Sequence, residues 1–140
     1  MEDADRRIVQ LLRQDGRMSY TDLGKAVGLS TSAVHQRVRR LEERGVITGY
    51  TALVNHEALG RSLTAFVAVT PLDHRAPDDI PERLHEVSEV EACYSVAGDE
   101  NYLLKVRVAT PNALEDLLGV LRANAGVSTK TTVVLSTPWE

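Results

Sequence analysis

Four arginines fall within eight residues of a chain whose overall charge is negative. The chain has 140 residues and a formal net charge of −4 at pH 7. Residues 1–50 hold nine Lys or Arg against seven Asp or Glu, whereas residues 51–140 hold seven against thirteen. The arginines of the basic cluster, all within Leu29–Gly45, are Arg37, Arg39, Arg40 and Arg44. A compact basic block in an acidic chain indicates a polyanionic partner for that block alone.

The same segment predicts a helix with one face suited to double-stranded DNA. Val34, Val38 and Leu41 are spaced so that they point to one side of a helix. A helix fits the major groove, where residues near its N-terminus reach base edges and flanking arginines meet phosphates. The candidate DNA-binding residues are Ser30, Thr31, Ser32, His35, Gln36, Arg37, Arg39 and Arg40.

Ion pairing within the protein is an alternative explanation for some of these charges. Arg39 and Arg40 are spaced to pair with Glu43 along one helix, as on any solvated charged face. Arg37 lies beside the apolar stripe, so an ion pair within the domain fits it as well as a phosphate contact. The short polar residues before the basic ones favour DNA binding for the set as a whole.

Three helices and a tight turn are expected to position this face. Apolar residues recur at helical spacing after Asp3 or Asp5, after Ser19 and after Ser30, and these residues can cap the three helices. Glycines end the helices at Gly16, Gly28 and Gly45. With the four-residue turn Val27–Ser30, the pattern is a helix-turn-helix. The β-rich segment Val46–Val54 predicts a small wing or a strand leading out.

The second half of the chain predicts a β-α-β-β-α-β order, the ferredoxin-like arrangement. Its strands are expected at residues 63–70, 91–97, 102–108 and 128–135. Its helices are expected around Ile80, Leu84 and Val87, and from Thr110 and Pro111 to Gly126. The fold class is therefore α+β. The predicted boundaries are a winged helix-turn-helix at 1–50, a linker or strand at 51–61 and the ferredoxin-like domain at 62–140.

Several classes of protein are disfavoured by composition. No apolar run approaches the ~20 residues of a membrane span, and the first fifteen residues are too charged for a signal peptide, so a cytoplasmic protein is expected. Cys93 is the only cysteine, and no Cys/His cluster has metal-ligand spacing. No catalytic Ser/His/Asp or Cys/His set is apparent, and the acids Asp78 and Asp79 resemble helix N-terminal charges. We expect no enzyme activity, metal or cofactor.

Residues across both halves resemble the Lrp/AsnC family of transcription regulators, also called feast/famine regulators. The resemblance is carried by Asp5–Ile8, Gly16–Ser19, Val27–Ser30, Arg37–Glu42, Gly45–Ile47, Gly49–Tyr50, Val96–Asp99 and Tyr102–Leu104. It implies a DNA-binding winged helix-turn-helix joined by a short linker to a ferredoxin-like regulatory domain. It also implies homodimers formed through that second domain, assembly into octamers, and an amino acid bound between dimers.

The loop after Val96 is similar to the effector loop of that family, and its chemistry suits an amino acid. Gly98 would allow close approach of the chain and unusual dihedral angles, and neighbouring N–H groups would hold the carboxylate. Asp99 or Glu100 would accept from the ammonium group. Thr131 and Thr132 on the last strand would supply hydroxyls, and Tyr102 either a hydroxyl or a wall. The candidate effector-binding residues are Gly98, Asp99, Glu100, Asn101, Tyr102, Thr131 and Thr132. Asn101 replaces an acid common in the family, which leaves the identity and orientation of the ligand open. The same loop is also good hairpin-turn chemistry without any ligand.

The leading hypothesis is a sequence-specific DNA-binding regulator whose DNA affinity or assembly responds to a small effector, expected to be an amino acid. The alternative is an architectural protein that compacts DNA and has no effector.

Overall fold

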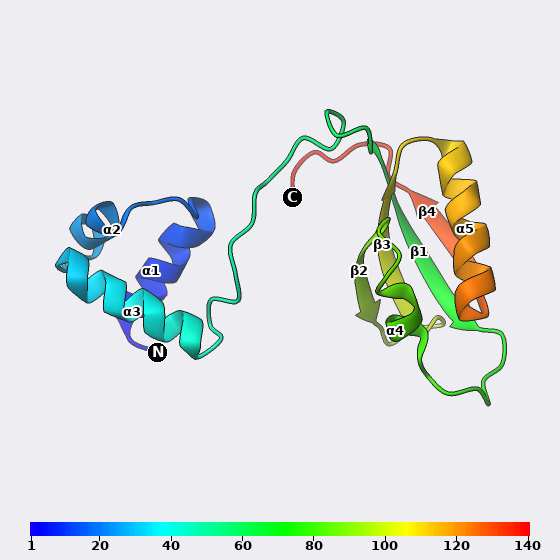
Figure 1. The fold of residues 1–140 in the computed structure, drawn as a ribbon, viewed down its shortest axis with the longest axis horizontal. Coiled ribbons are helices and arrows are strands. Elements are labelled where there is room, and N and C mark those ends of the chain that lie inside the picture. The colour runs from blue at the N-terminus through cyan, green and yellow to red at the C-terminus, as the bar shows by residue number, and fades with distance from the viewer. The chain divides into compact units, whose positions relative to one another are not determined.

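Two separate hydrophobic cores form in the chain, one in Met1–Leu53 and one in Val54–Glu140. The computed structural model describes all of residues 1–140 (Figure 1). The first unit is helical, and the second combines one sheet with two helices. The structure therefore has the α+β character expected from the sequence, with helical periodicity in the first part and strand patterns in the second.

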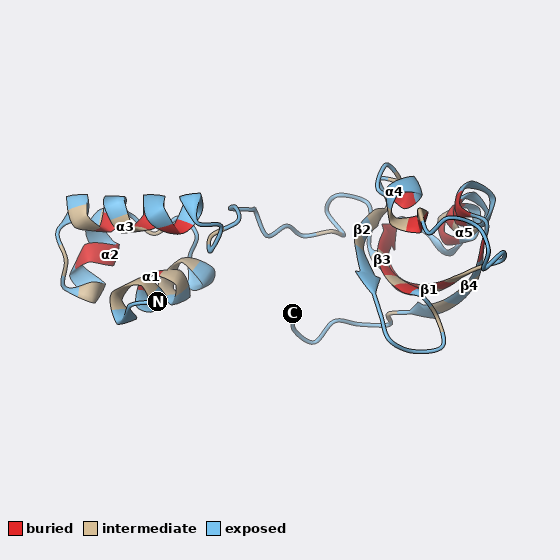
Figure 2. Ribbon diagram, turned by 90° about the horizontal axis from the view of Figure 1, so that it is seen from below, coloured by how far each residue is buried: buried red, intermediate tan, exposed pale blue.

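Three helices make up the first unit: α1 (Asp3–Gln14), α2 (Tyr20–Val27) and α3 (Thr31–Glu43). Each helix contributes to the buried core, and the red ribbon segments of α2 and α3 in Figure 2 mark their buried residues. Its buried members are Ile8, Leu23, Val34, Val38 and Leu41. The apolar stripe predicted for α3 is thus confirmed, and it leaves the opposite side of that helix facing solvent.

Side-chain caps define the starts of α2 and α3. The Ser19 hydroxyl accepts from the Asp22 amide at 3.0 Å, and the Ser30 hydroxyl accepts from the Ala33 amide at 3.2 Å, as predicted. Between these helices Gly28 adopts φ 73°, a left-handed conformation that favours glycine. The predicted cap of α1 was wrong. Its N-cap is Glu2, which makes no side-chain cap, while Asp3 and Asp5 lie inside the first turn and favour the helix dipole there.

The segment after α3 contains no strand, so the predicted wing or strand at 46–54 was wrong for this chain. The amides of Val46 and Ile47 both donate to the Leu41 carbonyl oxygen and close the end of the helix. Beyond them the backbone is irregular. A strand needs a neighbouring strand to hydrogen-bond with, and the first unit has only helices to offer.

The second unit has the predicted β-α-β-β-α-β order. Its strands are β1 (Leu63–Pro71), β2 (Val90–Ser95), β3 (Tyr102–Val108) and β4 (Val127–Val133), and its helices are α4 (Ile80–Leu84) and α5 (Pro111–Ala125). The strands form one antiparallel sheet in the order β2-β3-β1-β4. Both helices cover the same face of this sheet (Figure 2). Thr110 caps α5 through the Ala113 amide at 3.1 Å, and Gly126 ends it in a left-handed conformation.

The core of the second unit lies between the sheet and its helices. Ala65, Val67 and Val69 of β1 point into it, as do Leu104 and Val106 of β3. The helix α4 is shorter than predicted and ends at Leu84, although Val87 still packs against the core. In this protein no helix combines the length and the apolar character needed to cross a bilayer.

Candidate DNA-binding helix and effector loop

The solvent-facing side of α3 carries most of the candidate DNA-binding residues. Its buried side is formed by Val34, Val38 and Leu41. The exposed candidates on the helix are Thr31, Ser32, His35, Gln36, Arg39 and Arg40. One helix face therefore presents hydroxyl, imidazole and amide groups in its first half and two guanidinium groups further along, an order that matches base contacts followed by phosphate contacts.

Contacts within the unit hold the start of this face. The Ser30 hydroxyl, exposed at the N-cap, lies 3.3 Å from the Ser32 hydroxyl. The Thr31 and Thr21 hydroxyls are 3.4 Å apart, which links α3 to α2. These contacts orient the hydroxyl groups at the helix start while leaving their residues exposed to solvent.

His35 is also held from α2. Its ring meets the edge of the Tyr20 ring with centroids 5.3 Å apart and planes at 76°. Such an edge-to-face contact favours one orientation of the imidazole. His35 remains exposed, so its ring is oriented without being covered.

The two arginines further along the face differ in their surroundings. Arg39 donates to Glu43 at 3.1 Å along the helix, with 73% of the Arg39 side chain exposed. An exposed pair of this kind is weak, because water and salt screen it. Arg40 forms no ion pair in the structure, so its guanidinium is free to meet a phosphate. The pair with Glu43 expected from spacing thus forms for Arg39 only.

Arg37 occupies a different environment from the other candidates. One of its terminal nitrogens donates to the Asp5 carboxylate at 3.0 Å and to the Glu2 carboxylate at 3.1 Å. The hydrogen bond that Arg37 donates to Asp5, followed by the one it donates to Glu2, raises the pKa of Arg37 above its ordinary value. The ion pair within the domain that the sequence left open is confirmed. In the structure the Arg37 guanidinium is thus engaged by carboxylates of α1 and its N-cap.

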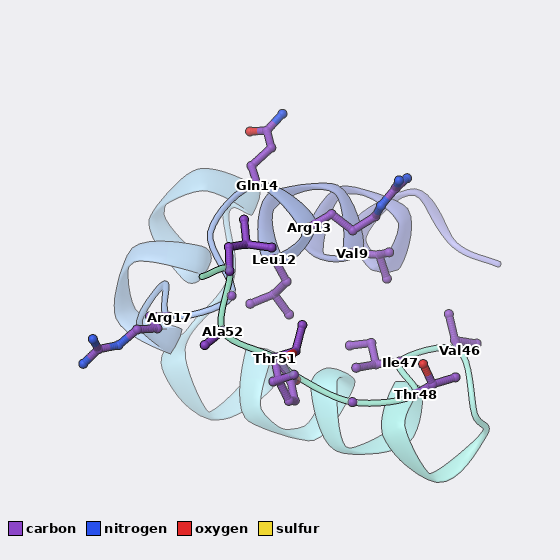
Figure 3. A pocket seen from close by; sticks show the side chains of 14 residues that line it. Val9, Leu12, Arg13, Gln14, Arg17, Val46, Ile47, Thr48, Thr51 and Ala52 are labelled. Atoms are coloured by element: carbon purple, nitrogen blue, oxygen red, sulfur yellow. The ribbon is translucent and has the colours of Figure 1, made fainter. Parts of the chain in front are cut away.

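A cavity of about 640 Å³ lies between α1 and the segment that follows α3 (Figure 3). Val9 and Leu12 line it from the helix, and Ile47 lines it from the segment. The side chains of Arg13 and Arg17 extend away from the space. Since no charged groups converge on it, the cavity lacks the polar anchors that orient a charged ligand.

The predicted effector loop is a closed turn on the surface of the second unit. The Asn101 amide donates to the Val69 carbonyl oxygen at 3.1 Å, and the Val96 amide donates to the Asn101 carbonyl oxygen at 3.1 Å. Gly98, Asp99 and Asn101 are exposed, and Glu100 is half-buried. The loop thus has both an anchored backbone and accessible side chains.

Gly98 would allow unusual dihedral angles, but its φ is not positive in the structure. A Cβ atom added there would meet no atom within 4 Å. Nothing inside this chain therefore requires glycine at that position. The space above Gly98 is open to a group from outside the chain.

The Tyr102 hydroxyl donates to both carboxylate oxygens of Asp78, at 2.8 and 2.9 Å. This hydrogen bond is the main reason why the pKa of Tyr102 lies above its ordinary value, and burial of the hydroxyl is the second. The hydroxyl proton of Tyr102 is thus engaged within the chain. Sequence reasoning missed Asp78 as a partner because 24 residues separate the two side chains. Its neighbour Asp79 instead pairs with Arg83 at 2.8 Å.

The two threonines predicted to supply hydroxyls point to opposite faces of the sheet. Thr131 pairs with Val67, whose side chain lies in the helix-covered core, whereas Thr132 pairs with Phe66 on the other face. The seven candidate effector residues therefore do not form one cluster within a single chain. No group of three or more His, Cys, Asp or Glu side chains is placed to hold a metal ion.

Comparisons with known proteins match both units separately. Residues 1–42 match the AsnC-type helix-turn-helix domain, and residues 64–140 match the Lrp/AsnC ligand binding domain. The chain is 55% identical over 137 residues to the HTH-type transcriptional regulator LrpA of Mycobacterium tuberculosis, covering 98% of this chain and 91% of that protein. It is 42% identical over 140 residues to the Leucine-responsive regulatory protein of Escherichia coli, covering 96% of this chain and 85% of that protein.

Solved structures show the same likeness. A feast or famine regulatory protein from M. tuberculosis complexed with L-methionine superposes with a TM-score of 0.98 at 54% identity, covering 99% of this chain and 95% of that one. A transcriptional regulator from Neisseria meningitidis, also in complex with L-methionine, superposes with a TM-score of 0.92 at 28% identity, covering 100% and 93%.

Proposed function

Because the chain belongs to the Lrp/AsnC family of transcriptional regulators, we propose that it binds DNA through the exposed face of α3 and responds to an amino acid held by its second unit. The observation that carries the DNA half is the placement of His35, Gln36 and Arg40 on the side of α3 opposite its buried stripe. The curated relatives named above are transcriptional regulators rather than enzymes.

The DNA-contact set divides into two roles. Ser30, Thr31, Ser32, His35 and Gln36 lie at the start and middle of α3, where they reach base edges. Arg39 and Arg40 lie further along and meet phosphates, which sets affinity for all sequences alike. Binding by a homodimer places two such helices on half-sites spaced by whole helical turns.

The DNA assignment is tested by anisotropy titrations against a duplex selected in vitro with the wild-type protein and a scrambled duplex of the same composition. Arg40→Gln weakens binding to both duplexes and reduces the slope of log K against log salt by about 0.9. Gln36→Ala weakens binding to the selected duplex only. Arg75→Gln, in the second unit, is the matched control, since its exposed side chain makes no ion pair. An unchanged slope with Arg40→Gln would remove the phosphate assignment.

The effector site is built on the loop Gly98–Asn101. The open space above Gly98 admits the backbone of a free amino acid, and Asp99 is exposed to accept from its ammonium group. Two relatives with the same fold were solved with L-methionine, which supports this class of ligand. A thermal-shift screen of the twenty amino acids, methionine first, tests it. A ligand at 100 times its dissociation constant raises stability by about 2.7 kcal/mol.

Assembly follows from the uncovered face of the sheet. The apolar side chains of Phe66, Leu103 and Tyr94 lie on the face that no helix covers. A second copy of the chain, which carries the same three side chains on that face, is the partner that buries them in a homodimer. Because Thr131 and Thr132 point to opposite faces, the candidate effector residues converge only if several copies contribute, as at an interface between dimers of an octamer.

The alternative function is an architectural protein that compacts DNA without an effector. It would be favoured if no amino acid raised the melting temperature in the screen and if the protein bound the selected and scrambled duplexes with similar affinity.

A further inference from the structure

We propose that Arg37 is a positioning residue for DNA recognition, which fixes the rotation of α3 against the first turn of α1. This inference rests on the proposed DNA binding by α3. It assigns to Arg37 a role that requires no contact with DNA. The partners that would transmit this role are Asp5 and Glu2, which lie 32 and 35 residues away in the sequence.

The two arms of the contact differ in strength. The Asp5 side chain is only 13% exposed and accepts at 3.0 Å, so water and salt screen this arm weakly. The Glu2 side chain is 74% exposed and accepts at 3.1 Å, so it adds little by itself. The Arg37 side chain is 27% exposed, between these extremes. The Arg37–Asp5 pair therefore carries most of the restraint.

Arg37 lies at the point where such a restraint acts on the recognition face. It follows Gln36 directly and precedes Arg40 by one helical turn. The buried contacts of α3 are made by Val34, Val38 and Leu41, whose aliphatic packing is non-directional. The polar contact of Thr31 and the ring contact of His35 tie α3 to α2 instead. The charged hydrogen bonds of Arg37 are directional and tie α3 to α1, so they restrain the rotation of the helix about its own axis more tightly than the aliphatic packing does. Rotation of α3 would move Gln36 and Arg40 together.

The acids near the start of α1 serve this contact and not a helix cap. The N-cap residue Glu2 makes no side-chain cap, and its carboxylate and that of Asp5 both accept from Arg37.

Asp5→Asn separates the positioning role from a phosphate contact. If Arg37 met a phosphate, removing the Asp5 charge would free its guanidinium and strengthen binding. If Arg37 positions α3, the same change weakens binding to the selected duplex by about tenfold, comparable to one mismatched base pair, with less effect on the scrambled duplex. Arg37→Gln weakens the selected complex similarly and leaves the salt slope unchanged, whereas a lost phosphate contact reduces that slope by about 0.9.

The exchanged pair, Asp5→Arg with Arg37→Asp, provides the rescue. The double variant is expected to prefer the selected duplex more strongly than either single charge reversal does. Such a recovery would not occur if the single variants had simply lost their fold. Glu2→Gln is the matched control and changes the preference little. Circular dichroism at the titration temperature shows which variants are folded. Asp5→Asn is the most conservative substitution, because it removes only the charge of the side chain.

The outcomes separate this inference from the proposed function. A wild-type protein that selects no duplex overturns DNA binding and the positioning role with it. A wild-type protein that binds its duplex, together with stronger binding by Asp5→Asn or a reduced slope with Arg37→Gln, overturns the positioning role alone.

Discussion

Tyr102 and Asp78 are joined by a hydrogen bond of 2.8 Å from the tyrosine hydroxyl to the nearer carboxylate oxygen. Tyr102 is the first residue of β3 and directly follows the predicted effector loop, while Asp78 lies in the segment between β1 and α4. The bond therefore ties the end of the loop to a segment that precedes it by 24 residues. Only 8% of Tyr102 is exposed, so its ring is part of the core that supports the loop.

Tyr102→Phe loosens the end of β3 beside the loop. The ring still fills the core, but the net contribution of one hydrogen bond is lost, so amide exchange in β3 accelerates by about fivefold. Hydrogen-exchange mass spectrometry of the full chain measures this. Tyr94→Phe is the control, because the Tyr94 hydroxyl makes no hydrogen bond within the chain. Equal exchange rates in wild type and Tyr102→Phe would show that the bond adds nothing to the anchoring of the loop.

The ionisation of Tyr102 makes this bond sensitive to alkaline pH. The hydrogen bond to Asp78 is the main cause that raises the folded-state pKa of Tyr102 above its ordinary value of 10.0. Since the folded pKa is the higher one, the stabilisation is fully present below pH 10.0 and is lost as pH rises through the folded pKa. When phenolate absorbance is followed during an alkaline titration, Tyr102 is expected to ionise at a higher pH than an ordinary tyrosine and to appear as a separate step. That step disappears in Tyr102→Phe and persists in Tyr50→Phe, which removes the other tyrosine with a raised pKa.

Gly24→Ala destabilises the turn between α2 and α3. An added Cβ would lie 2.5 Å from the carbonyl oxygen of Leu29, so backbone must move, at a cost of about 1–3 kcal/mol. Gly119→Ala is the opposite case, since a Cβ there meets nothing within 4 Å and a glycine inside α5 costs about 0.5–1 kcal/mol relative to alanine. Differential scanning calorimetry is expected to show a lower melting temperature for the first variant and a higher one for the second.

Two substitutions of Ser30 distinguish its contribution to the stability of α3 from its contribution to DNA binding. Ser30→Ala removes the cap on the Ala33 amide and costs about 1 kcal/mol. Ser30→Asp keeps an accepting cap but brings a negative charge to the face that meets DNA, so stability is retained while affinity for every duplex falls. Thermal unfolding and anisotropy titration of both variants test this. Undiminished DNA affinity in the folded Ser30→Asp protein would mean that the start of α3 does not approach DNA.

The uncovered sheet face is tested by Phe66→Asp. A charge at this half-buried position opposes the pairing of two apolar faces, so sedimentation velocity is expected to report a protein with a smaller mass than wild type. Val120→Asp adds the same charge at an exposed apolar site of α5 and leaves the mass unchanged. A Phe66→Asp protein of wild-type mass would place the assembly surface elsewhere.

The sequence was sufficient where neighbouring residues determine structure. Helix caps at Ser19, Ser30 and Thr110 are local contacts over three residues, and the buried stripe of α3 follows from helical spacing alone. The same holds for the order of strands and helices in the second unit, because each element carries its own periodicity. It failed at residues 46–54, whose β-rich composition has no strand to pair with inside the unit.

Contacts between distant residues were decided by the tertiary structure. The sequence left Arg37 undecided between a phosphate and an ion pair, and only the packing of α1 against α3 brought Asp5 to its guanidinium. The sequence suggested that the Tyr102 hydroxyl could contact a ligand, whereas in the fold this hydroxyl donates to Asp78. It offered Thr131 and Thr132 as hydroxyl groups for one ligand, whereas the register of β4 on β1 turns them to opposite faces of the sheet. Charge and periodicity specify which groups a segment carries, but the partner of each group depends on how the segments pack.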